Sequence, residues 1–396
     1  MTPAARVAAA IGVLDTVLDG APAEQVLTNW ARKSRFAGSS DRAAVRDLVF
    51  DALRRRRSFA ALGGGRDGRA AMIGALRASD TPIDAIFTGE GHAPDPLSAA
   101  ERDHLSRPAA MSDAERLDCP DWLMAPLRDS LGADFSAVMT ALQRRAPVFL
   151  RVNIARTTRA DMMAALSNEG IVTQPVGWVE TALEVTGNPR RIQQSAPYRA
   201  GLIELQDASS QAVVAALPFS GGKVLDYCAG GGGKTLALAA RARGGDMTRP
   251  AQFFAHDAAP ERMRDLPARA ARADVDVTLA DSGTVRRAGP FDLVLLDVPC
   301  SGSGSWRRAP QGKWALTPET LGALTRSQAE ILENTHDLVA SGGVLAYVTC
   351  SLLAVENEDQ VTAFRARNPD WHLVMTRRLT PLSFGDGFFI AILKRI

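Results

Sequence analysis

Two cysteines stand where a thiol could act as a nucleophile. Cys300 lies in the segment Asp297-Val-Pro-Cys-Ser-Gly-Ser-Gly304, and Cys350 lies between Thr349 and Ser351. Each follows an apolar run that is typical of a strand, whereas an inert structural cysteine usually lies within such a run. Cysteine reacts as a thiolate and can leave again, so the two thiols indicate covalent chemistry at one site. A disulfide between them is the alternative.

A glycine-rich turn precedes both cysteines in the chain. The apolar run that ends at Asp226 is followed by Cys228, Ala229 and Gly230–Gly233, and Lys234 opens a predicted helix. Glycines let a backbone turn sharply and approach a ligand closely. A Walker-type phosphate loop is not matched, because the first glycine of GxxxxGKT would fall at Cys228. By itself the turn indicates only a nucleotide-like ligand.

Four aspartates follow four successive predicted strands. They are Asp226, Asp257, Asp281 and Asp297. Ligands of open α/β sheets bind beyond the carboxyl ends of the strands, and an acid after the second strand can accept the ribose hydroxyls of a nucleotide. We therefore expect the four carboxylates around one crevice, with Asp257 at the ribose; solvated loop acids are the alternative.

The predicted strands that precede these side chains alternate with predicted helices along the chain. From about residue 201 the pattern predicts an α/β fold, with a parallel sheet that carries helices on both faces. The predicted strands are Lys223–Tyr227, Gln252–Ala255, Val275–Leu279, Leu293–Leu296, Gly343–Val348 and Phe388–Leu393. The predicted helices are Lys234–Arg241, Pro260–Arg269, Pro318–Leu338 and Val355–Ala366.

The chain before this segment divides into two parts. Apolar residues recur at helical spacing over residues 1–140, where Ser39–Asp41 is an expected helix start, and this part is predicted to be entirely helical. Residues 141–200 predict a small α+β domain, with strands at Val148–Asn153, Ile171–Val176 and Leu183–Val185 and a helix at Asp161–Glu169. Residues 201–396 form the third predicted domain.

Composition narrows the function classes. The chain has 396 residues, of which 46% are hydrophobic and 23% charged, and a net charge of +2. It lacks an apolar run of about 18 residues, so we expect no membrane span. Its four cysteines are far apart and its five histidines do not cluster with them, which argues against a metal site and favours a reducing, cytoplasmic environment. The arginine run 54–57 suits the phosphates of a nucleic acid, although a solvated surface is the simpler interpretation.

Three motifs together resemble those of the RNA cytosine-C5 methyltransferases. The segment 297–304 is similar to DAPCSGTG, Thr349–Ser351 with 356–358 is similar to TCS…ENE, and 226–235 is similar to the cofactor loop DxCAAPGGKT. Further matches are Gln206–Ser210, Trp314 after Arg307-Arg308, and Asp386–Phe389. The resemblance extends over about residues 120–396, and the helical region is similar to the NusB-like domain of the bacterial RsmB (Fmu/Sun) branch.

The resemblance implies a Rossmann-like class I methyltransferase fold, S-adenosylmethionine as cofactor, and carbon 5 of an RNA cytosine as the methylated atom. Small-subunit rRNA is the favoured substrate, tRNA is the alternative, and we expect a monomer. Cys350 would be the nucleophile, Cys300 would assist release, and Asp297 would bind the cytosine edge beside Lys234. Arg151 and Asn153 would contact the RNA backbone. The implied cofactor residues are Cys228, Ala229, Gly230, Gly231, Gly232, Gly233, Lys234, Asp257, Arg262, Asp281 and Asp297, with Asp281 beside the adenine.

The sequence departs from the family motifs at a few positions. Gly230 and Gly231 replace the usual Ala and Pro of the cofactor loop, and Ser303 replaces Thr. The loop should therefore be more flexible, and cofactor binding weaker.

Two other function classes are alternatives. A non-catalytic RNA-binding protein would not need the cysteine at 350, and a dinucleotide-dependent dehydrogenase would carry a spaced GxGxxG.

Overall fold

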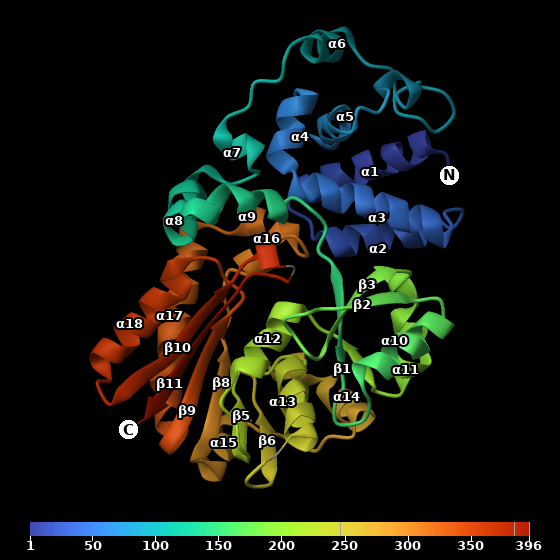
Figure 1. The fold of residues 1–396 in the computed structure, drawn as a ribbon. Helices are drawn as coiled ribbons and strands as arrows, with labels where there is room; N and C mark the ends of the chain where they lie inside the picture. Colours follow the sequence, from blue (N-terminus) through green and yellow to red (C-terminus); the bar gives the residue numbers. More distant parts are fainter. Residues whose placement is uncertain (246, 384, 396) are drawn as a thin grey trace. The chain divides into compact units, whose positions relative to one another are not determined.

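The fold was analysed in a computed structural model, which describes residues 1–245, 247–383 and 385–395 (Figure 1). The chain forms two compact units. The first comprises Met1–Arg145 and Trp306–Ala315, and the second comprises Ala146–Ser305 and Leu316–Ile396. A membrane-spanning helix is absent from the described residues, because every helix there is too short or too polar.

The first unit is helical, as its residue spacing predicts. Its core consists mainly of aliphatic side chains from the first helices, including Leu14, Val45 and Ile73. Helix α3 begins at Ser39, but Gly38 is the capping residue, and its N–H donates to the Asp41 carboxylate at 3.1 Å. The helices are α1 (Pro3–Leu18), α2 (Ala23–Lys33), α3 (Ser39–Arg54), α4 (Arg56–Gly63), α5 (Gly68–Ala78), α6 (Ala99–Ser106), α7 (Asp113–Arg116), α8 (Asp121–Leu131), α9 (Phe135–Leu142) and α16 (Pro310–Ala315).

Helix α16 is remote in sequence from the rest of the first unit and packs against α3. The Trp314 indole N–H donates to the carbonyl of Leu53 at 2.6 Å, and the Lys313 ammonium donates to the carbonyl of Arg54 at 3.2 Å. Lys313 is fully buried, and burial lowers its pKa to about 8. The residue spacing gives no indication that this segment joins the helical unit.

The second unit contains a small antiparallel sheet in the order β2-β3-β1-β4. Strand β4 was not predicted, and it lies beyond residue 200, so the small sheet extends past the expected domain boundary. The elements are β1 (Val148–Val152), α10 (Arg159–Asn168), β2 (Val172–Pro175), β3 (Ala182–Gly187), α11 (Ala196–Arg199) and β4 (Ile203–Leu205).

The large sheet of the second unit has the order β10-β11-β9-β8-β5-β6-β7. Strand β11 runs antiparallel to both of its neighbours, so the sheet is mixed and not wholly parallel as predicted. Its strands are β5 (Gly222–Asp226), β6 (Ala251–Ala255), β7 (Val277–Leu279), β8 (Phe291–Asp297), β9 (Val339–Thr349), β10 (Trp371–Leu379) and β11 (Phe388–Arg395).

Helices cover both faces of this sheet (Figure 1). On one face Val224 and Leu293 pack against residues of α12, α13 and α14. On the other, Leu225 and Val294 pack against residues of α15, α17 and α18, because alternate strand residues point to opposite faces. These helices are α12 (Ala208–Ala216), α13 (Gly233–Gly244), α14 (Leu266–Ala273), α15 (Ser282–Ala288), α17 (Pro318–Thr335) and α18 (Glu358–Arg367).

Candidate active site

The carboxyl ends of the central strands bring the predicted catalytic residues together. Asp226 is the last residue of β5, Asp297 is the last residue of β8, and Cys350 directly follows β9. The strands are parallel and in register, with Asp226 opposite Leu295 and Asp297 opposite Val348. The ends of three neighbouring strands thus lie at one edge of the sheet, where α/β proteins bind their ligands.

The two cysteine thiols are in direct contact. The sulfur atoms of Cys300 and Cys350 lie 3.3 Å apart and are both partly buried. Both are free thiols in the described structure, so the disulfide alternative finds no support there. The hydrogen bond with Cys350, together with burial, raises the pKa of the Cys300 thiol well above its usual value. Cys300 therefore keeps its proton near neutral pH, and its S–H group can donate a hydrogen bond to the sulfur of Cys350.

A buried glutamate joins the two cysteine loops. Glu356 is fully buried and accepts hydrogen bonds from the Ser301 N–H at 2.8 Å and the Ser301 hydroxyl at 2.5 Å. The Ser351 hydroxyl donates to the same carboxylate at 2.5 Å, and the Gln328 amide donates to it at 3.0 Å. A buried carboxylate needs such donors, since an unpaired one would be costly. Each cysteine is thus followed by a serine that Glu356 holds.

Backbone and side-chain hydrogen bonds complete the connection between these loops. The Gly304 N–H donates to the carbonyl of Cys350 at 2.9 Å, and the Gly304 carbonyl accepts from Gly387 at 2.8 Å. The Thr349 hydroxyl donates to Asn357 at 2.5 Å. Segment 356–358 was predicted only as part of a motif, and Gln328 was not predicted, because the sequence around it carries no local signal.

Lys234 faces Asp297, the last residue of β8. Its ammonium lies 2.5 Å from the Asp297 carboxylate and 5.1 Å from the centre of the Phe388 ring. Burial alone would lower the pKa of Lys234, but the attraction of Asp297 outweighs burial and raises it. Lys234 is 8% exposed. It is therefore a buried cation within the site, and a solvated helix start is excluded.

The glycine turn takes a backbone shape that suits a closely bound ligand. Gly230 and Gly232 have φ angles of +50° and +75°, which non-glycine residues rarely adopt. A Cβ atom at Gly232 would lie 2.1 Å from Leu266. The Asp257 carboxylate, which is nearly buried, accepts the Gly230 N–H at 2.9 Å and the Ala259 N–H at 3.0 Å. Asp257 thus shapes the turn as well as standing at the end of β6.

Asp226 lies beneath this turn. One carboxylate oxygen accepts from the Thr235 hydroxyl at 2.6 Å, and among the described residues the other has no hydrogen-bond partner. Burial raises the pKa of Asp226 to about 7. A buried, half-satisfied carboxylate beside a glycine turn fits a ligand that carries a positive charge or N–H donors. S-adenosylmethionine carries both, so the residues present fit that cofactor.

The remaining cofactor candidates have mixed environments. Arg262 lies at the same turn, 3.3 Å from Asp257, whereas Asp281 is exposed and accepts from the Thr284 N–H at 2.7 Å as the cap of α15. Cys228 is partly buried, and burial raises the pKa of its thiol. Asp281 thus has a structural role that suffices to explain it, and its place beside an adenine stays a prediction.

Arg151 and Asn153 do not form an RNA-contacting surface, contrary to the prediction. They are 4% and 6% exposed. Arg151 donates to the Gln206 amide at 2.8 Å and to the carbonyl of Gly233 at 2.6 Å, and Asn153 donates to the carbonyls of Gly201 and Ala273 at 3.2 Å. These hydrogen bonds, from one guanidinium nitrogen of Arg151 and the amide nitrogen of Asn153, attach β1 to the core of the second unit.

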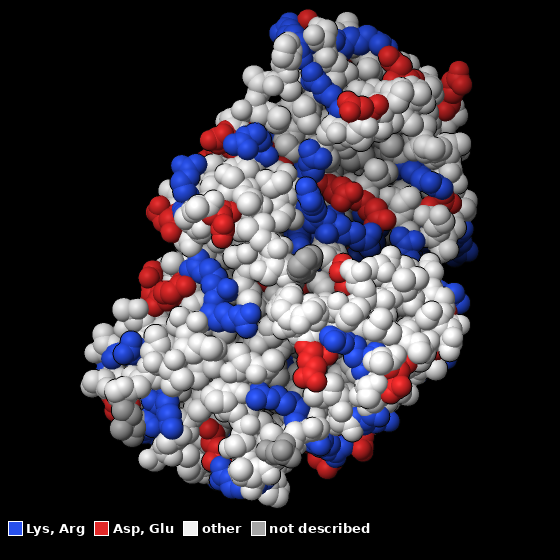
Figure 2. Space-filling model, in the orientation of Figure 1, with Lys and Arg blue, Asp and Glu red and all other residues white. Residues whose placement is uncertain are grey.

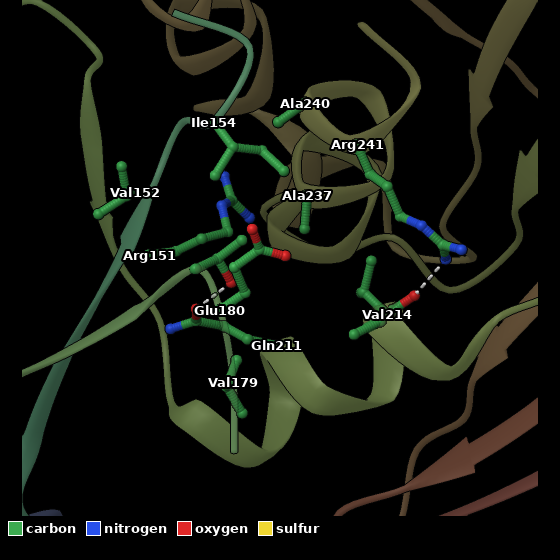
Figure 3. Close-up of a pocket in the computed structure, with 12 residues that line it drawn as sticks. Arg151, Val152, Ile154, Val179, Glu180, Gln211, Val214, Ala237, Ala240 and Arg241 are labelled. Atoms are coloured by element: carbon green, nitrogen blue, oxygen red, sulfur yellow. Dashed lines mark hydrogen bonds between the residues drawn. The ribbon is translucent and has the colours of Figure 1, made fainter. Parts of the chain in front are cut away.

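Arg151 also borders a cavity of about 200 Å³ beside helices α12 and α13 (Figure 3). Figure 3 shows Gln211 and Glu180 near Arg151. The Thr181 hydroxyl donates to the Gln211 side chain at 2.7 Å. Neither cysteine, nor Asp297 or Lys234, lines this cavity. It is therefore distinct from the site formed by the strand ends.

The arginine run 54–57 is also more structural than predicted. Arg54 is 6% exposed and donates to the carbonyl of Arg307 at 2.6 Å. Arg55 lies over the Phe59 ring, Arg56 lies over the Trp314 ring, and Arg57 pairs with an acid. On the face shown in Figure 2, basic and acidic side chains are interspersed, in keeping with the small net charge. The prediction that Arg54 binds phosphate is wrong.

Comparisons with known proteins agree with this geometry. The family described as 16S rRNA methyltransferase RsmB/F matches residues 214–394, and the ferredoxin-like domain of the same family matches residues 119–191. Neither match extends into residues 1–118, so the NusB-like resemblance stays a prediction. The ribosomal RNA small subunit methyltransferase B of Vibrio cholerae is 33% identical over 74% of this chain and 69% of its own length.

Solved structures share the fold. The crystal structure of the protein PH0851 covers 100% of this chain and 99% of its own, with a TM-score of 0.76 and 22% identity. A methyltransferase homologue from Pyrococcus horikoshii covers 72% of this chain and 100% of its own, with a TM-score of 0.62 and 26% identity. The chain therefore belongs to the RsmB/F family of S-adenosylmethionine-dependent methyltransferases.

Proposed function

We propose that this chain methylates carbon 5 of a cytosine in 16S rRNA, through a covalent bond between Cys350 and the ring. The observation that carries the proposal is the contact between the two thiols, 3.3 Å apart, next to the Lys234–Asp297 ion pair. A methyltransferase that acts on an exocyclic or hydroxyl group would not need two thiols at its reaction centre. The names of the related proteins support rRNA of the small subunit as the substrate.

Cys350 is assigned as the nucleophile because Thr349–Ser351 resembles the TCS motif: its thiol gives its proton to solvent and becomes a thiolate, while Cys300, whose pKa is raised, keeps its own proton. Its thiolate adds to carbon 6, and the electron pair of the C5–C6 double bond moves to carbon 5. S-adenosylmethionine, when bound, would supply an electrophilic methyl group to that carbon, and its sulfur would keep the electron pair of the broken S–CH3 bond. Asp297 accepts from the exocyclic amine of the cytosine, and Lys234 stabilises the negative charge that spreads over the ring.

Release reverses the covalent step. The proton on carbon 5 passes to solvent, its electron pair restores the C5–C6 double bond, and the C6–S bond breaks so that Cys350 leaves as a thiolate. The raised pKa of Cys300 keeps its S–H available as a hydrogen-bond donor to the departing sulfur. The serines held by Glu356 keep both loops in place during this exchange.

The residues that would hold the cofactor surround the glycine turn. Asp257 would bind the ribose hydroxyls, with Arg262 beside it, and the oxygen of Asp226 that has no partner among the described residues would accept a hydrogen bond from the cofactor. A cytosine within folded RNA must be unstacked to reach the thiols.

The direct test combines labelled methyl transfer with identification of the product. Purified protein and S-adenosylmethionine with a labelled methyl group are incubated with 16S rRNA transcript in one reaction and with tRNA in another. The RNA from each reaction is then digested to nucleosides. Label in 5-methylcytidine from 16S rRNA supports the proposal. Label in another nucleoside, or only in tRNA, contradicts the assigned atom or the assigned RNA respectively.

A further inference from the structure

The carbonyl groups of the glycine turn are bound by two arginines that come from outside the turn. Arg151 of β1 donates to the carbonyl of Gly233 at 2.6 Å, and Arg269 of α14 donates to the carbonyl of Gly231. Such charge-assisted hydrogen bonds are stronger and more directional than neutral ones. The sequence motif gives no indication of either arginine.

One buried carboxylate stands between these arginines. Glu204 of β4 is 5% exposed and lies opposite Arg151 in the register of the two antiparallel strands. It accepts from Arg269 at 3.0 Å and also from Arg272. A buried glutamate needs such donors, because an unpaired buried charge would be costly, and it fixes the direction of each guanidinium. Strand β4 therefore orients the group that binds Gly231.

The Arg269 guanidinium occupies the space beside Gly231. A Cβ atom built on Gly231 would lie 2.9 Å from the Arg269 guanidinium nitrogen. Unlike its two neighbours, Gly231 has no positive φ angle, so its backbone would accept an ordinary residue. A side chain here would therefore push against the arginine and displace it from the turn, but it would not strain the backbone. This is the position at which the related motif carries proline.

We propose that Glu204 and Arg269 are positioning residues that hold the glycine turn in its cofactor-binding shape and so set the affinity for S-adenosylmethionine. A run of glycines loses much conformational freedom when it is ordered. If the protein has already ordered the turn, the ligand does not have to bear that cost on binding. The pair thereby replaces the stiffness that a proline would give at position 231. This inference rests on the proposed role of the turn in binding the cofactor.

The test measures cofactor affinity by titration calorimetry, together with methyl-transfer kinetics. We expect Arg269→Ala to raise the Kd for S-adenosylmethionine about tenfold and Glu204→Gln about fivefold, while kcat at saturating cofactor changes less than about twofold. Arg272→Lys is the matched control, since Arg272 shares Glu204 but does not contact the turn, and its Kd should equal that of the wild type. Asp257→Ala is the positive control for lost binding.

A double-mutant cycle separates positioning from general stability. Gly231→Ala should weaken binding in the wild type, because its Cβ meets Arg269, but should restore at least half of the lost affinity in the Arg269→Ala protein. Thermal unfolding without ligand identifies variants that fold poorly. If Arg269→Ala is one of them, Arg269→Lys replaces it, because a lysine can reach Glu204 or the Gly231 carbonyl but not both.

An unchanged Kd in Arg269→Ala overturns the proposal, as does an equal loss in Arg272→Lys or a loss of kcat alone. Additive effects of Gly231→Ala and Arg269→Ala also overturn it. These outcomes are independent of the RNA product: wild-type protein that binds cofactor but makes no 5-methylcytidine contradicts the proposed function and leaves this inference standing.

Discussion

The ammonium of Lys234 lies 2.5 Å from the carboxylate of Asp297, so the residue that opens α13 is paired with the residue that ends β8. The pair links the glycine turn to the cysteine loops, because Asp297 leads directly into the segment that contains Cys300. Asp297 outweighs burial in raising the pKa of Lys234, so the ammonium stays charged near neutral pH. A fixed positive charge thus stands where we place the cytosine edge.

Removal of this cation should strongly lower the rate of methyl transfer and should change the affinity for the cofactor much less. We expect Lys234→Met to reduce the single-turnover rate at least about 100-fold, since removing one preorganised electrostatic group from a reaction centre typically costs about 10²–10³ in rate. Lys234→Arg should retain part of the rate. Lys223→Met is the control, because Lys223 bonds a carbonyl at the opposite end of β5. A Lys234→Met rate within threefold of wild type would refute the role.

The raised pKa of Asp226 predicts a pH-dependent stability. From its ordinary value near 4 the pKa rises to about 7 because of burial. Between these values only the folded chain holds the proton, so stability falls as pH rises, by up to about 1.4 kcal/mol per pH unit. Asp226→Asn removes this dependence and should gain stability relative to wild type between about pH 5 and pH 7.5.

Urea denaturation of both proteins at the two pH values measures this difference. Asp265→Asn serves as the control, because its carboxylate is 77% exposed, and its stability difference from wild type should not change with pH. If the difference in the free energy of unfolding between Asp226→Asn and wild type is the same at both pH values, Asp226 is ionised in the folded protein.

Arg54 should act on the stability of the helical unit and not on RNA affinity. Its guanidinium donates to Asp51 and to the carbonyl of Arg307, both at 2.6 Å. We expect Arg54→Ala to lower the free energy of unfolding by about 1–3 kcal/mol and to leave the salt dependence of RNA binding unchanged. Arg42→Ala, on the exposed side of the same helix, is the control for unfolding. A reduced salt slope with wild-type stability would restore the phosphate-binding interpretation.

Much of the fold was predictable from residue spacing. The strands around Val224, Leu293 and Leu345 are continuous apolar runs, as buried parallel strands require. Strand β10 was missed because it lies at the sheet edge and carries exposed polar residues such as Arg377. Strand β4 was missed because Ile203–Leu205 is too short to show a period.

The site was predictable to the extent that its residues follow strand ends. The proximity of Cys300, Cys350 and Asp297 could be inferred because parallel strands end at one edge. The partners Gln328, Glu204 and Arg269 could not, since they come from α17, β4 and α14 and only tertiary packing brings them to the loops. The exposure of Arg151 was predicted wrongly for the same reason: a strand residue's environment depends on what covers that face of the strand.

The roles of the two cysteines give the most direct test of the central claim. Wild type, Cys350→Ala and Cys300→Ala are incubated with labelled 16S rRNA and S-adenosylmethionine, and the products are separated on a denaturing protein gel. If Cys350 attacks and Cys300 assists release, Cys300→Ala should show a stable band shifted by the attached RNA, and Cys350→Ala should show neither adduct nor methylation. A stable adduct in Cys350→Ala, with none in Cys300→Ala, would contradict the assignment.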